Sequence, residues 1–191
     1  MSNKETIEIT ISPAIGVERI WTIEGFRDDP WRMLDDNAPW PKEGSFVVPI
    51  SRWRAEHHAL VAAEKLNIGL ALAVADDFDP ASDELDRVQL IVLPFPKFTD
   101  GRAYSTARRL REQWGYRGEL RASGDVLFDQ LPLMLRCGFD SFSIADASTL
   151  ARLEREGLRM PTRMYQSFTC SSVAERPAIA SKGEHALTAA E

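Results

Sequence analysis

The stretch Leu90-Ile-Val-Leu-Pro-Phe-Pro-Lys-Phe-Thr-Asp-Gly-Arg102 decides the fold class of this chain. It begins with the apolar run Leu90–Leu93, which is typical of a strand buried on both faces of a parallel sheet. It continues as a polar turn that contains a glycine, Phe95–Arg102, and then opens a helix. In open α/β folds ligands bind at this edge of the sheet, where the free N–H groups of a helix start favour an anion.

Strand-like and helix-like segments alternate on both sides of this stretch. The expected strands are 46–50, 68–74, 89–93, 119–122 and 139–144. The expected helices are 51–65 capped by Ser51, 102–114, 125–137 with Gly138 as a left-handed C-cap, and a last one that Asp146 or Ser148 caps and that ends near Glu156. About five mainly parallel strands with flanking helices follow from this order, and the fold class is α/β. An open three-layer sheet is our first expectation. A partial or degenerate β/α barrel is the alternative, since a complete barrel takes about 250 residues.

The two ends of the chain differ from this central part. Residues 19–23 and 30–34 are expected to pair as an N-terminal β-hairpin around the turn-like segment 24–29. Residues 16–165 are expected to form a single α/β domain after a flexible stretch, 1–15. The tail 166–191 is poor in large apolar residues, which predicts that it is mostly disordered, or that it folds on contact with a partner.

Composition narrows the function classes. The net charge of −6 makes nucleic acid a poor partner, and no apolar run reaches the roughly 20 residues of a membrane span. The N-terminal residues do not resemble a secretory signal, and the two cysteines, Cys137 and Cys170, fit no zinc spacing. We therefore expect a cytoplasmic protein without a metal site. The six carboxylates of 76–86 lack the order of a calcium loop and are read as a solvated connector.

The candidate site lies where two neighbouring strands end. Lys97 and Arg102 flank the turn Thr99–Gly101, and a second turn, Gly124–Asp125, follows the next strand and should reach the same edge. Asp125 is either a helix N-cap or a site carboxylate that acts as a general base. The expected ligand-binding residues are Lys97, Thr99, Asp100, Gly101, Arg102, Tyr104, Arg121 and Gly124.

Charge is distributed unevenly around this site. The window 97–121 holds seven basic and three acidic residues in an otherwise acidic chain, which favours an anionic ligand or an acidic partner surface. The alternative is that Arg108, Arg109 and Arg111 solvate an exposed helix face.

Four central motifs resemble one bacterial family. They are Phe95–Ser105, Gly115–Ala122, Gly124–Gln130 and Arg136–Asp140, joined by Asp29–Trp31 and Val48–Trp53 nearer the N-terminus. Together they are similar to the family called domain of unknown function 934, over about residues 20–145. Members of that family are often labelled oxidoreductases of sulfite reduction, because their genes tend to lie beside those of sulfite reductase and adenylyl-sulfate reductase. The resemblance implies these two enzymes as partners and supplies no catalytic residues.

The sequence itself supports no particular cofactor. No Gly-x-Gly-x-x-Gly turn follows a strand, and two cysteines cannot hold an iron–sulfur cluster. One hypothesis is therefore an accessory protein of assimilatory sulfate or sulfite reduction, which binds a small anion, a nucleotide or the reductase itself. The other is a small enzyme that acts on a sulfated or phosphorylated metabolite, held by Lys97 and Arg102 with Asp125 as acid or base. The two hypotheses differ in whether the chain is an enzyme.

Overall fold

The computed structural model describes residues 19–35, 37–60, 65–73, 76 and 85–159. The strands are β1 (Arg19–Thr22), β2 (Gly25–Asp28), β3 (Arg32–Met33), β4 (Gly44–Pro49), β5 (Leu66–Ala71), β6 (Val88–Phe95), β7 (Glu119–Gly124) and β8 (Ser141–Ile144). The helices are α1 (Ile50–Glu56), α2 (Arg102–Glu112), α3 (Leu131–Cys137) and α4 (Ala147–Glu156), with 3₁₀ turns at His57–Leu60, Leu85–Arg87 and Phe128–Gln130. Both expected flexible ends and most of the acidic connector lie outside the described residues.

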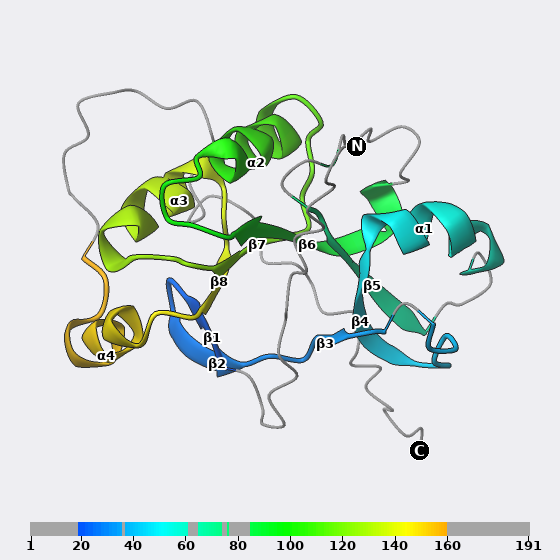
Figure 1. Cartoon of the computed structure of the whole chain (residues 1–191), viewed down its shortest axis with the longest axis horizontal. Coiled ribbons are helices and arrows are strands. Elements are labelled where there is room, and N and C mark those ends of the chain that lie inside the picture. Colours follow the sequence, from blue (N-terminus) through cyan, green and yellow to red (C-terminus); the bar gives the residue numbers. More distant parts are fainter. Residues whose placement is uncertain (1–18, 36, 61–64, 74–75, 77–84, 160–191) are drawn as a thin grey trace, which may run out of the picture.

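The strands form one sheet in the order β2-β1-β8-β7-β6-β5-β4-β3. Strands β3 to β8 follow one another in chain order and are parallel, while β1 pairs antiparallel with both β2 and β8. Each crossover leads to the next strand in the same direction, so right-handed connections place the helices on one face of the sheet. Figure 1 shows the sheet curled, with α1, α2, α3 and α4 outside it.

The curl brings the two edges of the sheet together. The edge strands β2 and β3 are separated by only three residues, Asp29–Trp31, so the edges are joined by a short piece of extended chain. Four residue steps span at most about 14 Å, so the end of β2 and the start of β3 lie no farther apart than this. We call this junction between the two edge strands the seam. Of the two shapes expected from the sequence, the structure shows the partial barrel, with the α/β class and the mainly parallel strands confirmed.

The outer face of the sheet packs against the helices. Its core is rich in aromatic side chains, and Trp53, Phe95, Phe139 and Phe142 are fully buried there. Trp21 of β1 joins the same core, with its ring 5.5 Å from that of Phe142. These large apolar side chains supply most of the driving force for folding, because each removes a large area from water.

The inner face of the curled sheet is smaller and more polar. Its apolar part includes Ile20, Val47 and Leu90, which are buried but do not belong to the outer core. Beside them, Arg121 and Ser141 are adjacent on β7 and β8 and are also buried. Strand alternation places these residues opposite the helices, so a charged group lies inside the curl.

Several boundaries differ from those expected. The hairpin partner of β1 is Gly25–Asp28 and not 30–34, because Gly25 at φ 120° allows a two-residue turn at Ile23–Glu24. Pro49 and not Ser51 precedes α1 at the N-cap position, with no side-chain cap.

The helix expected over 125–137 begins later, at Leu131, with Pro132 in its first turn, where proline is tolerated. The C-cap at Gly138, with φ 104°, and the side-chain cap by Asp146 on the Thr149 N–H are confirmed. Among the described residues, no helix is both long enough and apolar enough to cross a membrane.

Candidate functional site

The two turns expected at the carboxyl edge of the sheet do meet. Gly124 at the end of β7 has φ +107°, and a Cβ atom there would lie 2.6 Å from the Phe95 carbonyl oxygen. The Asp125 N–H donates to that same oxygen over 2.8 Å. Glycine is required because only a residue without a side chain lets the two backbones approach so closely in this conformation. The segment 125–130 therefore supports the loop 96–101 that follows β6.

Side chains from that supporting segment hold one residue of the loop. The Phe98 N–H donates to Asp125 Oδ2 at 2.9 Å, and the Gln130 amide Nε2 donates to the Phe98 carbonyl at 2.9 Å. Both backbone polar groups of Phe98 are thus fixed, while the residue is 48% exposed. We call Asp125 and Gln130 the Phe98 clamp. It presents a large apolar side chain to solvent from a backbone that is held in place.

The start of α2 carries its own carboxylate. Asp100 accepts hydrogen bonds from the Arg102 N–H at 3.2 Å and from the Arg102 guanidinium at 2.7 and 3.0 Å. The side-chain hydrogen bond from Arg102 lowers the pKa of Asp100, and the same contact raises the pKa of Arg102. At this helix start, one of the backbone N–H groups that an anion could use, that of Arg102, is therefore already bound by a carboxylate of the chain itself.

The remaining members of the expected site have different surroundings. Lys97, Thr99 and Gly101 are exposed in the loop. Tyr104 of α2 is half-buried, with its ring 5.3 Å from that of Phe95 in an edge-on contact. Burial raises the pKa of Tyr104 to about 12, so its hydroxyl stays protonated near neutral pH.

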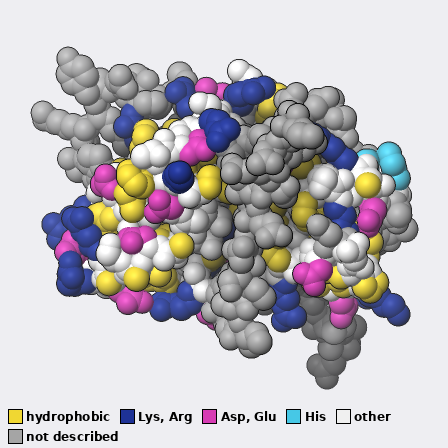
Figure 2. Space-filling view, in the orientation of Figure 1, with side chains coloured by type: hydrophobic (Ala, Val, Ile, Leu, Met, Phe, Trp, Pro, Cys, Tyr) yellow, Lys and Arg dark blue, Asp and Glu magenta, His cyan; other side chains and the backbone are white. Residues whose placement is uncertain are grey.

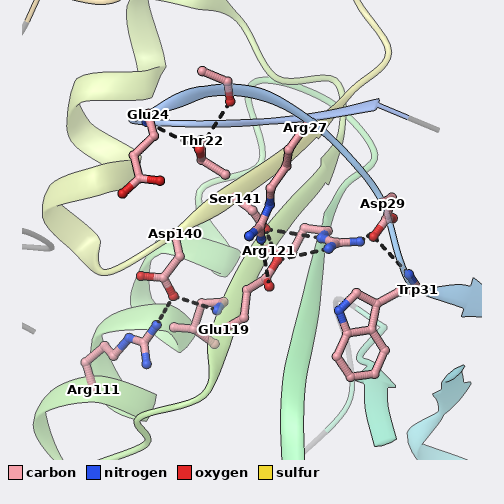
Figure 3. Close-up of polar contacts among 12 residues, drawn as sticks. Thr22, Glu24, Arg27, Asp29, Trp31, Arg111, Glu119, Arg121, Asp140 and Ser141 are labelled. Atoms are coloured by element: carbon pink, nitrogen blue, oxygen red, sulfur yellow. Dashed lines mark hydrogen bonds and ion pairs between the residues drawn. The ribbon is translucent and has the colours of Figure 1, made fainter. Parts of the chain in front are cut away.

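Arg121 does not take part in this edge. It lies inside the curled sheet, 3% exposed, and donates to Asp29 at 2.6 Å, Glu119 at 2.9 Å and Ser141 at 3.1 Å (Figure 3). Arg27 donates to the other Glu119 oxygen at 3.0 Å. Two arginines thus balance two carboxylates, and we call Asp29, Arg121, Glu119, Arg27 and Ser141 the inner network.

A second arginine was misread from the sequence. Arg111 does not solvate an exposed face: its side chain is 5% exposed and pairs with Asp140. It also donates to the backbone carbonyls of Tyr116, Gly118 and Gly138, which ties together the two turns before β7 and β8. The turn glycines beside it were the available signal, because carbonyls that become buried in such turns need donors. Over α2, other basic side chains lie at the surface with acidic ones among them (Figure 2).

Phe98 and Leu133 were not among the site candidates expected from the sequence. Both are large and exposed, Phe98 at 48% and Leu133 at 44%, and Leu133 lies about one helical turn after Gln130. The signal for Phe98 was an aromatic residue within an otherwise polar turn. Nothing in the sequence distinguishes Leu133 from the buried leucines of α3, because its exposure depends on how α3 packs.

The sequence comparison identifies the family. Residues 69–175, more than half of the 191-residue chain, match the model of a family described as a bacterial protein of unknown function, DUF934. The chain belongs to the DUF934 family. The match includes the loop 96–101, both residues of the Phe98 clamp and Arg121, and it leaves out β1 to β4. No curated protein matches the chain. Within the described part of this DUF934 chain, no group of three potential metal ligands comes together.

Proposed function

We propose that this DUF934 chain is an accessory protein of assimilatory sulfate or sulfite reduction, which docks on the reductase through its loop 96–101. The observation that carries the proposal is the clamp on Phe98. A large exposed aromatic side chain whose backbone is fixed on both sides loses little conformational entropy when a partner buries it. Aromatic residues of this kind are enriched among the residues that dominate binding energy at protein interfaces.

The surroundings of Phe98 fit a protein partner better than a small anion. At the α2 start, Asp100 accepts the Arg102 N–H and pairs with the Arg102 guanidinium, which weakens the attraction of this helix end for a further anion. Leu133 adds a second exposed apolar side chain on α3. A mixed edge of apolar and charged groups is typical of transient protein interfaces.

The same contacts weigh against the alternative of a small enzyme. Its general base would be Asp125, yet one carboxylate oxygen of Asp125 accepts the Phe98 N–H and its own N–H is held by Phe95. The Asp125 side chain therefore has a sufficient structural role without any catalysis. The inner network, whose carboxylates are paired with arginines, supplies no free base either.

The test is a binding measurement with purified sulfite reductase, by calorimetry or analytical size exclusion. The wild-type chain is expected to form a complex, and Phe98→Ala should weaken it about tenfold or more, the range of a residue that dominates an interface. Ile23→Ala is the matched control, because Ile23 is also a large apolar residue, 43% exposed, but lies in the β1–β2 turn. Its binding should equal that of the wild type.

Three results would contradict the proposal. They are no complex with the wild-type chain, an equal affinity for Phe98→Ala, or an equal loss for Ile23→Ala. Thermal stabilisation by sulfate or by a sulfated nucleotide, without any complex with the reductase, would instead support the enzyme. Adenylyl-sulfate reductase is tested in the same way as the second partner.

A further inference from the structure

The segment that joins the two edges of the sheet is held by few contacts. Residues 29–33 lead from the end of β2 through β3, and β3 pairs with β4 at only two positions, Arg32 with Phe46 and Met33 with Val47. Arg32 and Met33 are both exposed. The backbone of this segment is therefore not fixed by burial of its own side chains in β3.

What fixes the segment is a side chain from the opposite side of the curl. Asp29 Oδ2 lies 2.6 Å from the Arg121 guanidinium of β7, and the two side chains are 6% and 4% exposed. The other Asp29 oxygen accepts the Trp31 N–H at 3.1 Å, which shapes the turn around Pro30. Figure 3 shows the Asp29 carboxylate between the Arg121 guanidinium and the Trp31 backbone.

The chain on either side of the segment is anchored independently. Upstream, Trp21 of β1 is 3% exposed in the outer core. Downstream, the Arg52 side chain of α1 donates to the carbonyls of Asp35 and Ala38. Strands β4 to β8 pair with one another without any contribution from the segment. Both flanks of residues 29–33 are thus held by contacts of their own.

We propose that residues 29–33 are a strap that closes the curled sheet, that the Asp29–Arg121 ion pair is its clasp, and that the strap opens without unfolding the rest of the sheet. Opening uncovers the inner face around Arg121, which is buried when the strap is closed. With Asp29 withdrawn, the inner network keeps two arginines and one carboxylate. The opened inner face is therefore positively charged and suits an anionic group.

Amide hydrogen exchange of the full chain tests the clasp, by comparing a peptide that covers residues 29–35 with one that covers β6. Asp29→Ala should accelerate exchange in the strap peptide on the order of 100-fold, because breaking a buried ion pair is strongly destabilising. Exchange in β6 should change less than about threefold, since the two regions open independently. Asp28→Ala, at the exposed neighbouring carboxylate, should leave both peptides unchanged.

Two further variants keep the test decisive. Asp29→Asn keeps the shape of the side chain but removes its charge. It should accelerate amide exchange in the strap peptide, and not in β6, by about tenfold, even if Asp29→Ala does not fold. Glu119→Gln removes the other carboxylate on Arg121 but spares the clasp, so the strap should stay protected. Unchanged strap exchange in both Asp29 variants, or equal acceleration of the strap and β6, would overturn the proposal.

Discussion

Two arginine–aspartate pairs lie at opposite ends of the parallel strands, one at the carboxyl edge of the sheet and one at the amino edge. They differ in burial. At the carboxyl edge, Arg102 pairs with Asp100 at 2.7 Å while its side chain is 65% exposed. At the amino edge, Arg111 pairs with Asp140 with its side chain 5% exposed, and it also binds three backbone carbonyls.

The comparison shows that the same pair of residue types has different roles in different surroundings. A buried arginine with several acceptors fixes turns, because losing it leaves those acceptors unpaired. An exposed pair contributes little to stability and is free to exchange partners. In β/α folds the amino edge generally carries stability and the carboxyl edge carries function. In this chain the buried pair lies at the amino edge and the exposed pair at the carboxyl edge.

The largest effect is expected at the amino edge. Arg111→Ala should lower the free energy of unfolding by about 3–5 kcal/mol, since it leaves buried carbonyls and Asp140 without their donor. Denaturant unfolding followed by circular dichroism measures the change. Arg108→Ala, on the exposed face of α2 beside Glu112, is the control and should cost about 0.5 kcal/mol or less. Equal losses for the two variants would remove the distinction between buried and exposed arginines.

The next effect separates two glycines of the carboxyl edge. Gly124→Ala should cost about 1–3 kcal/mol, because a Cβ atom would lie 2.6 Å from the Phe95 oxygen and the backbone has φ +107°. Gly101→Ala should be nearly neutral, since nothing lies within 4 Å of its added Cβ atom and its φ is −85°. Thermal melting compares them. A stable Gly124→Ala variant would show that the two turns need not meet closely.

A smaller effect depends on pH and concerns the inner network. Burial raises the pKa of Glu119, but the Arg121 charge and the hydrogen bonds from Ser141 and Arg121 outweigh it, so the pKa is lowered overall. A carboxylate whose pKa is lowered by folding stabilises the folded state at pH values above its unfolded pKa of about 4.3. That stability is lost as the pH falls through the lower pKa of the folded state. The melting temperature of the wild type should therefore fall below about pH 4.3.

Glu119→Gln should show a shallower fall over the same range, because it has no carboxylate to protonate. Glu112→Gln, on the exposed face of α2, should follow the wild-type curve. If Glu119→Gln follows it as well, the inner network does not couple folding to pH.

The smallest effect is expected for the exposed pair. Arg102→Ala should leave the melting temperature unchanged within measurement error, because the pair is solvated. It should also leave Phe98 clamped, since Asp125 and Gln130 hold that residue independently of Arg102. A large loss of stability would mean that the exposed pair at the carboxyl edge contributes to folding stability as much as the buried pair at the amino edge.

Much of the fold was predictable from local patterns, and the seam was not. The apolar run at Leu90–Leu93, the cap at Asp146 and the left-handed Gly138 are local signals, and each was confirmed. The curl depends on which strands become neighbours, and this cannot be read from one segment at a time. Gly25 was read as part of a turn and not as the start of β2, because a four-residue strand after a two-residue turn gives a weak pattern.

The candidate site was predictable in position and not in detail. Strand order brings Gly124 and Asp125 to the loop after β6, as expected, because the ends of parallel strands meet at one edge. Which donors and acceptors then pair depends on side-chain packing. Asp100 pairs with Arg102, and Asp125 accepts the Phe98 N–H. Arg121 lies inside the curl and pairs with Asp29.

The central claim is that Asp125 acts as a clamp on Phe98 and not as a base. The most direct test is growth of a deletion strain on sulfate as the only sulfur source, complemented by Asp125→Asn or Asp125→Ala. Asparagine keeps an oxygen that accepts the Phe98 N–H but cannot take up a proton as a carboxylate does. We predict growth with Asp125→Asn and impaired growth with Asp125→Ala, with both variants folded by circular dichroism and both cultures restored by cysteine. Failure of Asp125→Asn to the same degree as Asp125→Ala would contradict the claim and indicate catalysis by the carboxylate.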